Sequence, residues 1–290
     1  MSHIGKDRVG HRIAIPGGGT IVLSWAARTD VGHRRSNNED SVVVASPMFA
    51  VADGMGGHAA GDRASAAAVE HLSPRKGVRF LDVETLERSL AAAADDIDAL
   101  AEGIPVGVGT TVTGAALVLD DGVPTFAVFN IGDSRVYGFE GNELVRVTTD
   151  HSVVQELVDA GVLAAEDAEA HPDSNVITRA LGFRDDPRPD VVMVPARAGL
   201  RLMICSDGLT KELGDERIRL HLAAGMPAGE TASALVDAAL AAGGRDNVTV
   251  AIVDVVSAPP IAPPPAPPLA ASPAAPLVPP VVGPPDLGER

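Results

Sequence analysis

Apolar and polar residues follow two different periods along the chain, and these periods predict both strands and helices. Short runs rich in Val, Ile, Thr and Phe, bounded by Gly, Asn and Asp, are typical of β-strands. They occur at 20–27, 41–46, 48–52, 110–119, 125–131, 135–140, 144–147, 200–205 and 248–256. Two of the gaps, Asp120-Asp121-Gly122 and Glu140-Gly141-Asn142, have the composition of tight hairpin turns, so the strands around them are expected to pair antiparallel.

Longer segments repeat their apolar residues every three or four positions, as amphipathic helices do. The segment 83–102 shows this clearly, with Leu86, Leu90 and Ile97 on one stripe. The helices expected lie at 59–72, 83–102, 152–160, 215–222 and 229–242. Strands in hairpins with separate helices indicate an α+β fold: a central antiparallel β-sandwich flanked by helices on both faces, in four layers ordered α-β-β-α.

The pattern divides the chain into three regions. Residues 1–19 carry charges and glycines without an apolar stretch, and we expect a flexible N-terminal extension. Residues 20–256 are expected to form one globular domain, in which 152–189 is an inserted flap. Of the 23 prolines, 13 lie in 257–290, a density that excludes sheet and helix, so this tail is expected to be disordered and polyproline-like. It can serve as a spacer or dock a proline-reading partner.

The composition excludes several classes of protein. A net charge of −16, from 39 acidic and 23 basic residues, leaves no basic footprint for nucleic acid. No apolar run approaches the roughly 18 residues of a membrane span, and the N-terminus lacks the apolar core of a secretory signal. The single cysteine, Cys205, cannot form an intrachain disulfide and fits a reducing compartment. We therefore expect a cytoplasmic protein, and we take it to be a monomer.

Acidic residues stand in Gly- or Asn-rich turns beside several of the predicted strands. The turns contain Glu39-Asp40, Asp53-Gly54, Asp133, Asp207-Gly208 and Asp246-Asn247. If the strand ends meet at one rim, these acids repel one another unless a cation lies between them. Hard oxygen ligands without a His or Cys cluster suit Mg²⁺ or Mn²⁺. The pattern therefore indicates metal-assisted hydrolysis, most simply of a phosphate ester.

Basic residues near these turns are candidates for binding the phosphate and for moving protons. The guanidinium of Arg35 can fork onto two phosphate oxygens, although a surface salt bridge is the alternative. His58 and His151 lie close to the acidic turns in the sequence, and either could donate a proton. A lone histidine near a site is more often a hydrogen-bonding or surface residue, so both assignments stay open.

Seven motifs occur in order between Ser24 and Val256. They are RSNNED at 35–40, VADGMGGH at 51–58, GTT at 109–111, IGDSR at 131–135, TRALG at 178–182, SDGL at 206–209 and GGRDNVT at 243–249. In this order they resemble the motifs of the bacterial type-2C, metal-dependent Ser/Thr protein phosphatases. Within that family the likeness is to phosphatases that oppose membrane Ser/Thr kinases in actinobacteria.

The resemblance implies a site for two Mn²⁺ or Mg²⁺ ions that activate water for attack on phosphoserine and phosphothreonine esters. Asp53 would bridge the two ions, and the carbonyl of Gly54 would bind beside it. Asp207 and Asp246 would complete the shell of one ion. Phosphorylated proteins, including a Ser/Thr kinase, would be the partners.

The remaining motif residues would support this centre. Glu39 and Asp40 would hold waters bound to the ions, and Asp133 would form a third-metal site together with Asp207. Asn247 would lie behind the ligands, and Arg35 would grip the phosphate.

Two features leave alternatives open. Many eukaryotic members of the family have a histidine directly after the Asp-Gly pair, where this chain has Met55. A metal-bound water or His58 could replace that histidine as the acid. A binding module that holds phosphopeptides without turnover, or a regulatory phosphatase acting on one phosphoserine switch protein, would carry the same acids.

Overall fold

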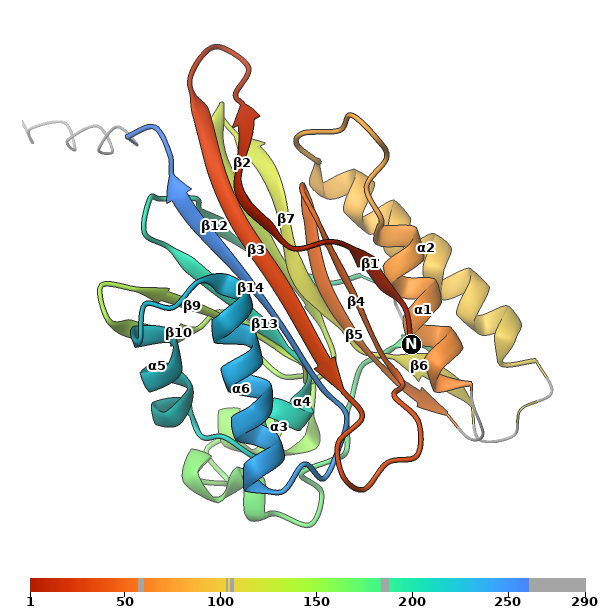
Figure 1. Ribbon diagram of the computed structural model, residues 1–290. Coiled ribbons are helices and arrows are strands. Elements are labelled where there is room, and N and C mark those ends of the chain that lie inside the picture. Colours follow the sequence, from red (N-terminus) through yellow and green to blue (C-terminus); the bar gives the residue numbers. More distant parts are fainter. Residues whose placement is uncertain (57–59, 103, 105–106, 184–187, 261–290) are drawn as a thin grey trace, which may run out of the picture. The chain divides into compact units, whose positions relative to one another are not determined.

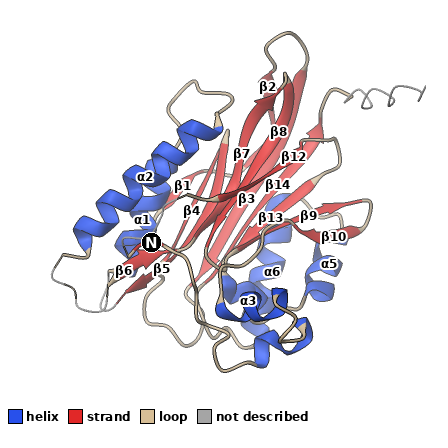
Figure 2. Cartoon of the chain, turned by 180° about the vertical axis from the view of Figure 1, so that it is seen from behind, coloured by secondary structure: helices blue, strands red, loops and turns tan. Residues whose placement is uncertain are grey.

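Two β-sheets lie face to face, with helices on the outside of each (Figures 1 and 2). The computed structural model describes residues 1–56, 60–102, 104, 107–183 and 188–260. His58 and most of the proline-rich tail, 261–290, lie outside the described residues.

The first sheet has the strand order β1-β4-β5-β7-β8-β12. All neighbours pair antiparallel except β1 and β4, which are parallel. Two short strands, β6 and β11, continue this sheet from the end of β5. The strands are β1 (His3–Gly5), β4 (Asp40–Ala45), β5 (Met48–Gly56), β6 (Val108–Thr110), β7 (Val112–Asp120), β8 (Val123–Ile131), β11 (Leu181–Gly182) and β12 (Asp190–Pro195).

The second sheet has the order β10-β9-β13-β14-β3-β2, and all of its neighbours are antiparallel. Its strands are β2 (Arg8–Ala14), β3 (Thr20–Asp30), β9 (Arg135–Glu140), β10 (Glu143–Arg146), β13 (Arg201–Cys205) and β14 (Val248–Ser257). The last strand therefore includes Ser257, the first residue assigned to the tail from the sequence.

Both predicted hairpins are present. In the β7–β8 turn, Asp121 and Gly122 have φ of 47° and 83°, and in the β9–β10 turn Gly141 and Asn142 have φ of 60° and 69°. Positive φ at both central residues defines the type I′ turn, whose twist matches that of paired strands. Asp, Asn and Gly tolerate this conformation, and this explains the turn composition.

Helices cover the outer face of each sheet, as predicted. Helix α1 (Gly61–Leu72) packs on β4 and β5, and α2 (Val83–Leu100) packs beside it. On the other side, α6 (Ala228–Ala242) packs on β3 and β14, with α5 (Asp215–Ala223) and the short α4 (Asp207–Thr210) next to it. The four-layer α-β-β-α prediction is confirmed.

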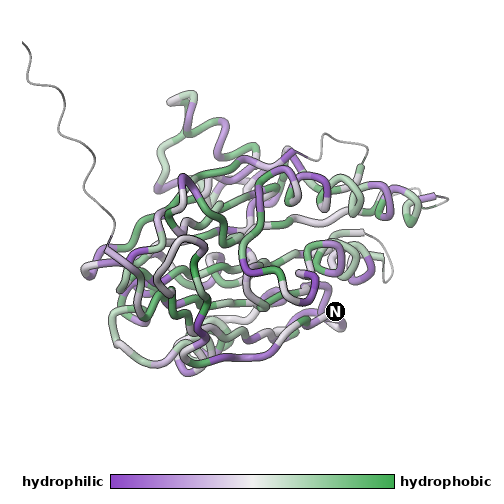
Figure 3. The backbone as a smooth tube through the Cα atoms, turned by 90° about the horizontal axis from the view of Figure 1, so that it is seen from above, coloured by the Kyte–Doolittle hydropathy of each residue, from purple (hydrophilic) through white to green (hydrophobic). Residues whose placement is uncertain are grey.

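Three apolar clusters correspond to the three spaces between these four layers. Trp25, Phe49 and Phe126 belong to the cluster between the sheets. Leu86, Leu90 and Ile97 of α2 belong to the cluster under α1 and α2. The third cluster lies under α4–α6 and includes Cys205, which is fully buried. Hydrophobic residues run along the strands in the interior (Figure 3).

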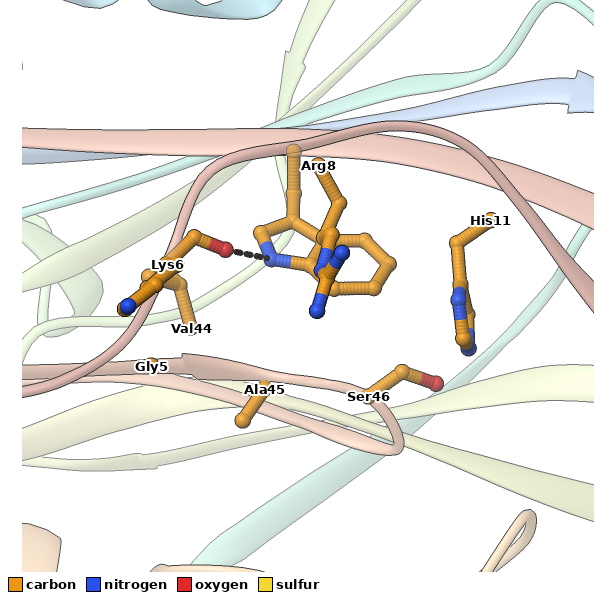
Figure 4. A pocket seen from close by; sticks show the side chains of 8 residues that line it. Gly5, Lys6, Arg8, His11, Val44, Ala45 and Ser46 are labelled. Atoms are coloured by element: carbon orange, nitrogen blue, oxygen red, sulfur yellow. Dashed lines mark hydrogen bonds between the residues drawn. The ribbon is translucent and has the colours of Figure 1, made fainter.

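The N-terminal segment forms strands, so the prediction of a flexible extension over 1–19 was wrong. β1 pairs with β4 in one sheet, and β2 pairs with β3 in the other. The carbonyl of Lys6, between them, accepts a hydrogen bond from the indole nitrogen of Trp25 at 3.0 Å (Figure 4). Both are edge strands with mostly exposed side chains, so their backbone pairing leaves no apolar pattern in the sequence.

Most of the insertion expected at 152–189 leaves the sheets and returns to them, because its two ends meet at a β-bridge. It contains α3 (Val153–Asp159) and a 3₁₀ turn over Ala165–Ala170. The bridge between Ser152 and Ile177 brings its ends together. Leu181, in β11, instead belongs to the cluster under α1 and α2, so the end of the expected flap is part of the sandwich.

Candidate metal centre

The site begins with Asp40 and Asp53, which are register partners at the end of the β4–β5 ladder. Strand β5 runs on to Gly56, so Asp53 lies within a strand and not in the turn expected after one. Its carbonyl accepts hydrogen bonds from the hydroxyl of Thr110 and the amide of Thr111, both at 2.9 Å. Pairing on two sides thus fixes the backbone that carries this carboxylate.

Gly54 is required by a close backbone approach from the start of α1. A Cβ atom on Gly54 would lie 2.0 Å from the carbonyl oxygen of Gly61 and 2.8 Å from that of Glu39. The amide of Gly54 also donates to the carbonyl of Glu39 at 3.2 Å. Only glycine allows these segments to pack together.

Asp40 is fully buried and only half satisfied by the protein. Its Oδ2 accepts hydrogen bonds from the hydroxyls of Ser206 at 2.8 Å and Thr249 at 2.6 Å, whereas its Oδ1 has no hydrogen-bond partner. Burial raises the pKa of Asp40 to about 7, although the two hydroxyl hydrogen bonds oppose the rise. An unpartnered buried carboxylate oxygen is costly, and a cation would satisfy it.

Asp207 and Gly208 form the first turn of α4, a short helix that the sequence analysis interpreted as a turn. The Oδ2 of Asp207 forms an ion pair with Lys211, and its Oδ1 is buried without a hydrogen-bond partner. A Cβ on Gly208 would meet the carbonyl oxygen of Asn247 at 2.0 Å. This close approach packs α4 against the residues that precede β14.

Asp246 and Asn247 join the start of β14 to the segment that precedes β4. Oδ2 of Asp246 accepts a hydrogen bond from Arg35 at 2.8 Å. Asn247 is buried; its Oδ1 accepts from the amide of Glu39, and its Nδ2 donates to the carbonyls of Val31 and Asn37. Asn247 therefore lies behind the acids and fixes the position of Glu39.

Asp133 is held by a network on its neighbours. The hydroxyl of Ser134 lies 2.9 Å from that of Thr111, and the amide of Gly132 donates to Nδ1 of His151 at 3.0 Å. Nε2 of His151 lies 3.1 Å from Asp190. One ring nitrogen thus holds this turn and the other contacts Asp190 at the start of β12, so His151 is a structural residue and not a free proton donor.

Electrostatics show that the predicted acids come together. Burial, together with the carboxylates of Asp40, Asp207, Asp133 and Asp246, raises the pKa of Asp53 well above its ordinary value. These residues come from separate segments of the chain, as the strand-end argument required. Repulsion of this kind indicates a site that takes up positive charge.

Glu39 has an acidic neighbour that the sequence analysis missed. Burial raises the pKa of Glu39, and Asp62, in the first turn of α1, adds to the rise. Oδ1 of Asp62 is buried without a hydrogen-bond partner. Acids are common in the first turn of a helix because a negative charge there interacts favourably with the helix dipole. Nothing in the sequence therefore distinguished Asp62 from such an acid.

The carboxylates are not arranged as a closed ligand set. Within the described ranges, no three His, Cys, Asp or Glu side chains are grouped closely enough to hold an ion as they stand. Asp207 instead contacts Lys211, and Asp246 contacts Arg35. Binding of an ion therefore requires some of the carboxylates to move closer together. A pocket of about 390 Å³ beside the N-terminal strands (Figure 4) is lined by none of the predicted site residues.

The fold and the arrangement of acids identify the class of protein. The chain matches the protein phosphatase 2C family over residues 32–242 and belongs to that family. None of the helices in the described part is long and apolar enough to cross a membrane.

Named relatives support the assignment. The serine/threonine protein phosphatase PstP of Mycobacterium tuberculosis is 42% identical over 242 residues, which cover 82% of this chain and 46% of PstP. The chain therefore spans about half the length of that relative. The protein phosphatase PhpP of Streptococcus pneumoniae is 38% identical over 242 residues, which cover 78% of this chain and 95% of PhpP.

Solved structures show the same fold. The catalytic domain of PstP in complex with two manganese ions matches with a TM-score of 0.70 and 38% identity, covering 82% of this chain and 100% of that one. The serine/threonine phosphatase of S. agalactiae matches with a TM-score of 0.73 and 33% identity, covering 80% and 99%.

Proposed function

We propose that this chain is a metal-dependent protein serine/threonine phosphatase that hydrolyses phosphoserine and phosphothreonine esters with two Mn²⁺ or Mg²⁺ ions. The observation that carries the proposal is the group of acids around Asp53, in which Asp40 and Asp207 each keep one buried oxygen without a partner. The names of the relatives and the two manganese ions of the PstP catalytic domain support the same function.

The donor set fits divalent cations that prefer oxygen. The acids expected to hold the ions are Asp53, Asp207 and Asp246, with the carbonyl of Gly54, and Glu39 and Asp40 would act through water. This set of ligands contains no His and no Cys, the residues that softer metals prefer, and the single cysteine of the chain, Cys205, is buried. When bound, such ions supply an activated water and stabilise negative charge on the phosphoryl oxygens.

Arg35 is proposed to bind the phosphate. Its side chain is 53% exposed and is held at the rim of the site by its hydrogen bond to Asp246. A guanidinium offers two parallel donors to a phosphate, and this geometry fixes the phosphorus for attack from one side. Exchange of Asp246 for phosphate would leave that carboxylate free to turn toward an ion.

The proton for the leaving serine or threonine oxygen has no described donor among the histidines near the site. His151 is engaged on both nitrogens, and Met55 cannot donate a proton. The role of His58 as the acid therefore stays a prediction. We further propose that the partners are phosphorylated proteins, including a Ser/Thr kinase. The protein is then a cytoplasmic monomer, and its proline-rich tail can dock a further protein.

Hydrolysis of p-nitrophenyl phosphate and a phosphothreonine peptide tests the function. Wild type and Asp207→Ala are assayed with Mn²⁺ and with EDTA. We expect phosphate release with Mn²⁺ that both EDTA and the substitution abolish. Folded protein that binds Mn²⁺ but releases no phosphate would overturn the enzyme assignment and favour a phosphopeptide-binding module. Strong preference for one phosphoserine switch protein over kinase-derived peptides would favour the regulatory role.

A further inference from the structure

Lys211 lies directly beside the acids of the candidate metal centre. It follows α4 by one residue, and its amide donates to the carbonyl of Asp207 at 2.8 Å. Residues four apart on a helical turn share one face, and the ammonium of Lys211 forms an ion pair with Oδ2 of Asp207. The helical turn thus places a positive charge on a predicted metal ligand.

The same ammonium acts on a second acid. Burial and the charge of Asp207 together raise the pKa of Asp133 to about 7, and the charge of Lys211 opposes this rise. Only 34% of the Lys211 side chain is exposed, and that of Asp207 is 12% exposed. The positive charge is therefore shared by Asp207 and Asp133 where water screens it poorly.

Among the other described acids of the centre, the positive charge comes from Arg35, which pairs with Asp246. The largest influences on Asp53 all raise its pKa, and the partners of Asp40 are the neutral hydroxyls of Ser206 and Thr249. The side chain of Arg35 is 53% exposed, whereas that of Lys211 is 34% exposed, so water screens the charge of Arg35 more strongly. Divalent ions are therefore needed most around Asp53, and least where Lys211 already supplies positive charge.

We infer that the ammonium of Lys211 is a built-in counter-ion at Asp133 and Asp207 and takes the place of a third divalent cation there, so that the centre binds two ions. The inference rests on the proposed function. A divalent ion brought beside a partly buried ammonium would be repelled, and an ammonium offers only donors and cannot act as a ligand. The first two ions escape this repulsion if Asp207 uses its unpartnered Oδ1.

Counting bound Mn²⁺ tests the inference without measuring activity. Equilibrium dialysis at saturating Mn²⁺ is carried out on wild type, Lys211→Met and Lys211→Gln. We expect two ions per wild-type chain and three in each neutral variant. Lys211→Arg, which keeps the charge, and Lys76→Met, which removes an exposed lysine far along the chain, are expected to stay at two.

A second substitution locates the added ion. In the Lys211→Met background, Asp133→Asn should return the count from three to two. Three ions in wild type, or two in both neutral variants with native circular dichroism, would overturn the role of Lys211 while leaving the phosphatase proposal intact. Fewer than two ions in wild type would instead contradict the metal-dependent function itself.

Discussion

Asn247 and Glu39 lie 208 positions apart in the chain and are joined by a hydrogen bond of 2.8 Å, from the backbone amide of Glu39 to Oδ1 of Asn247. The other end of the same side chain holds the carbonyls of Val31 and Asn37. One buried amide thus fixes the segment before β4 against the start of β14. The acids at both ends of this contact depend on it for their relative position.

Asn247→Ala should therefore lower both stability and metal affinity. The substitution removes the partner of the Glu39 amide and of the Val31 and Asn37 carbonyls. A polar group left without a partner away from water costs about 1–3 kcal/mol. Urea denaturation should show a lower midpoint, and calorimetric titration should show weaker Mn²⁺ binding. The exposed Asn175 offers a matched control, since Asn175→Ala should change neither. Equal midpoints for the two variants would contradict the structural role of Asn247.

Gly54→Ala should destabilise the protein through steric overlap. The new methyl group would lie 2.0 Å from the carbonyl oxygen of Gly61, and overpacking of this kind costs about 1–3 kcal/mol. Gly138→Ala is a matched change at another strand glycine, where the nearest atom lies at an ordinary 3.6 Å. Thermal unfolding should show a clear loss of Tm for Gly54→Ala alone, and a Tm unchanged from wild type would mean that α1 can move away freely.

The metal-free protein should lose stability as pH rises through the range set by Asp40. Burial raises the folded pKa of Asp40 from 3.8 to about 7, so between these values the folded state binds the extra proton. Stability then falls with rising pH. Denaturation in EDTA should show this decline, and Asp40→Asn should reduce it because the amide does not titrate. Parallel pH curves for the two proteins would exclude Asp40 as the source.

Regular patterns made much of the fold predictable. The apolar stripe of α2 and the turn residues Asp121-Gly122 and Gly141-Asn142 encode local structure directly, and the structure follows them. The acids of the site were also visible, because glycines beside Asp53 and Asp207 record close backbone contacts. These signals depend on neighbours in the sequence, so they can be read without a structure.

Features that depend on distant partners could not be predicted in the same way. β12 is an edge strand that ends at Pro195 and exposes Val192 and Met193, so its pattern resembles a loop. Lys211 is an ordinary polar residue in the sequence, and only the helical turn of α4 reveals its contact with Asp207. Thr110 and Thr111 likewise gain their meaning from pairing with Asp53.

The N-terminal strands have a practical consequence for anyone who shortens or tags this protein. Because β1 lies at one edge of the first sheet and β2 at one edge of the second, residues 3–14 cover one edge of each sheet. A chain that began at Thr20 would uncover the hydrogen-bonding rows of β3 and β4 together, and uncovered rows invite association with other chains. A shortened chain that still includes His3 should therefore associate less with other chains than one that begins at Thr20.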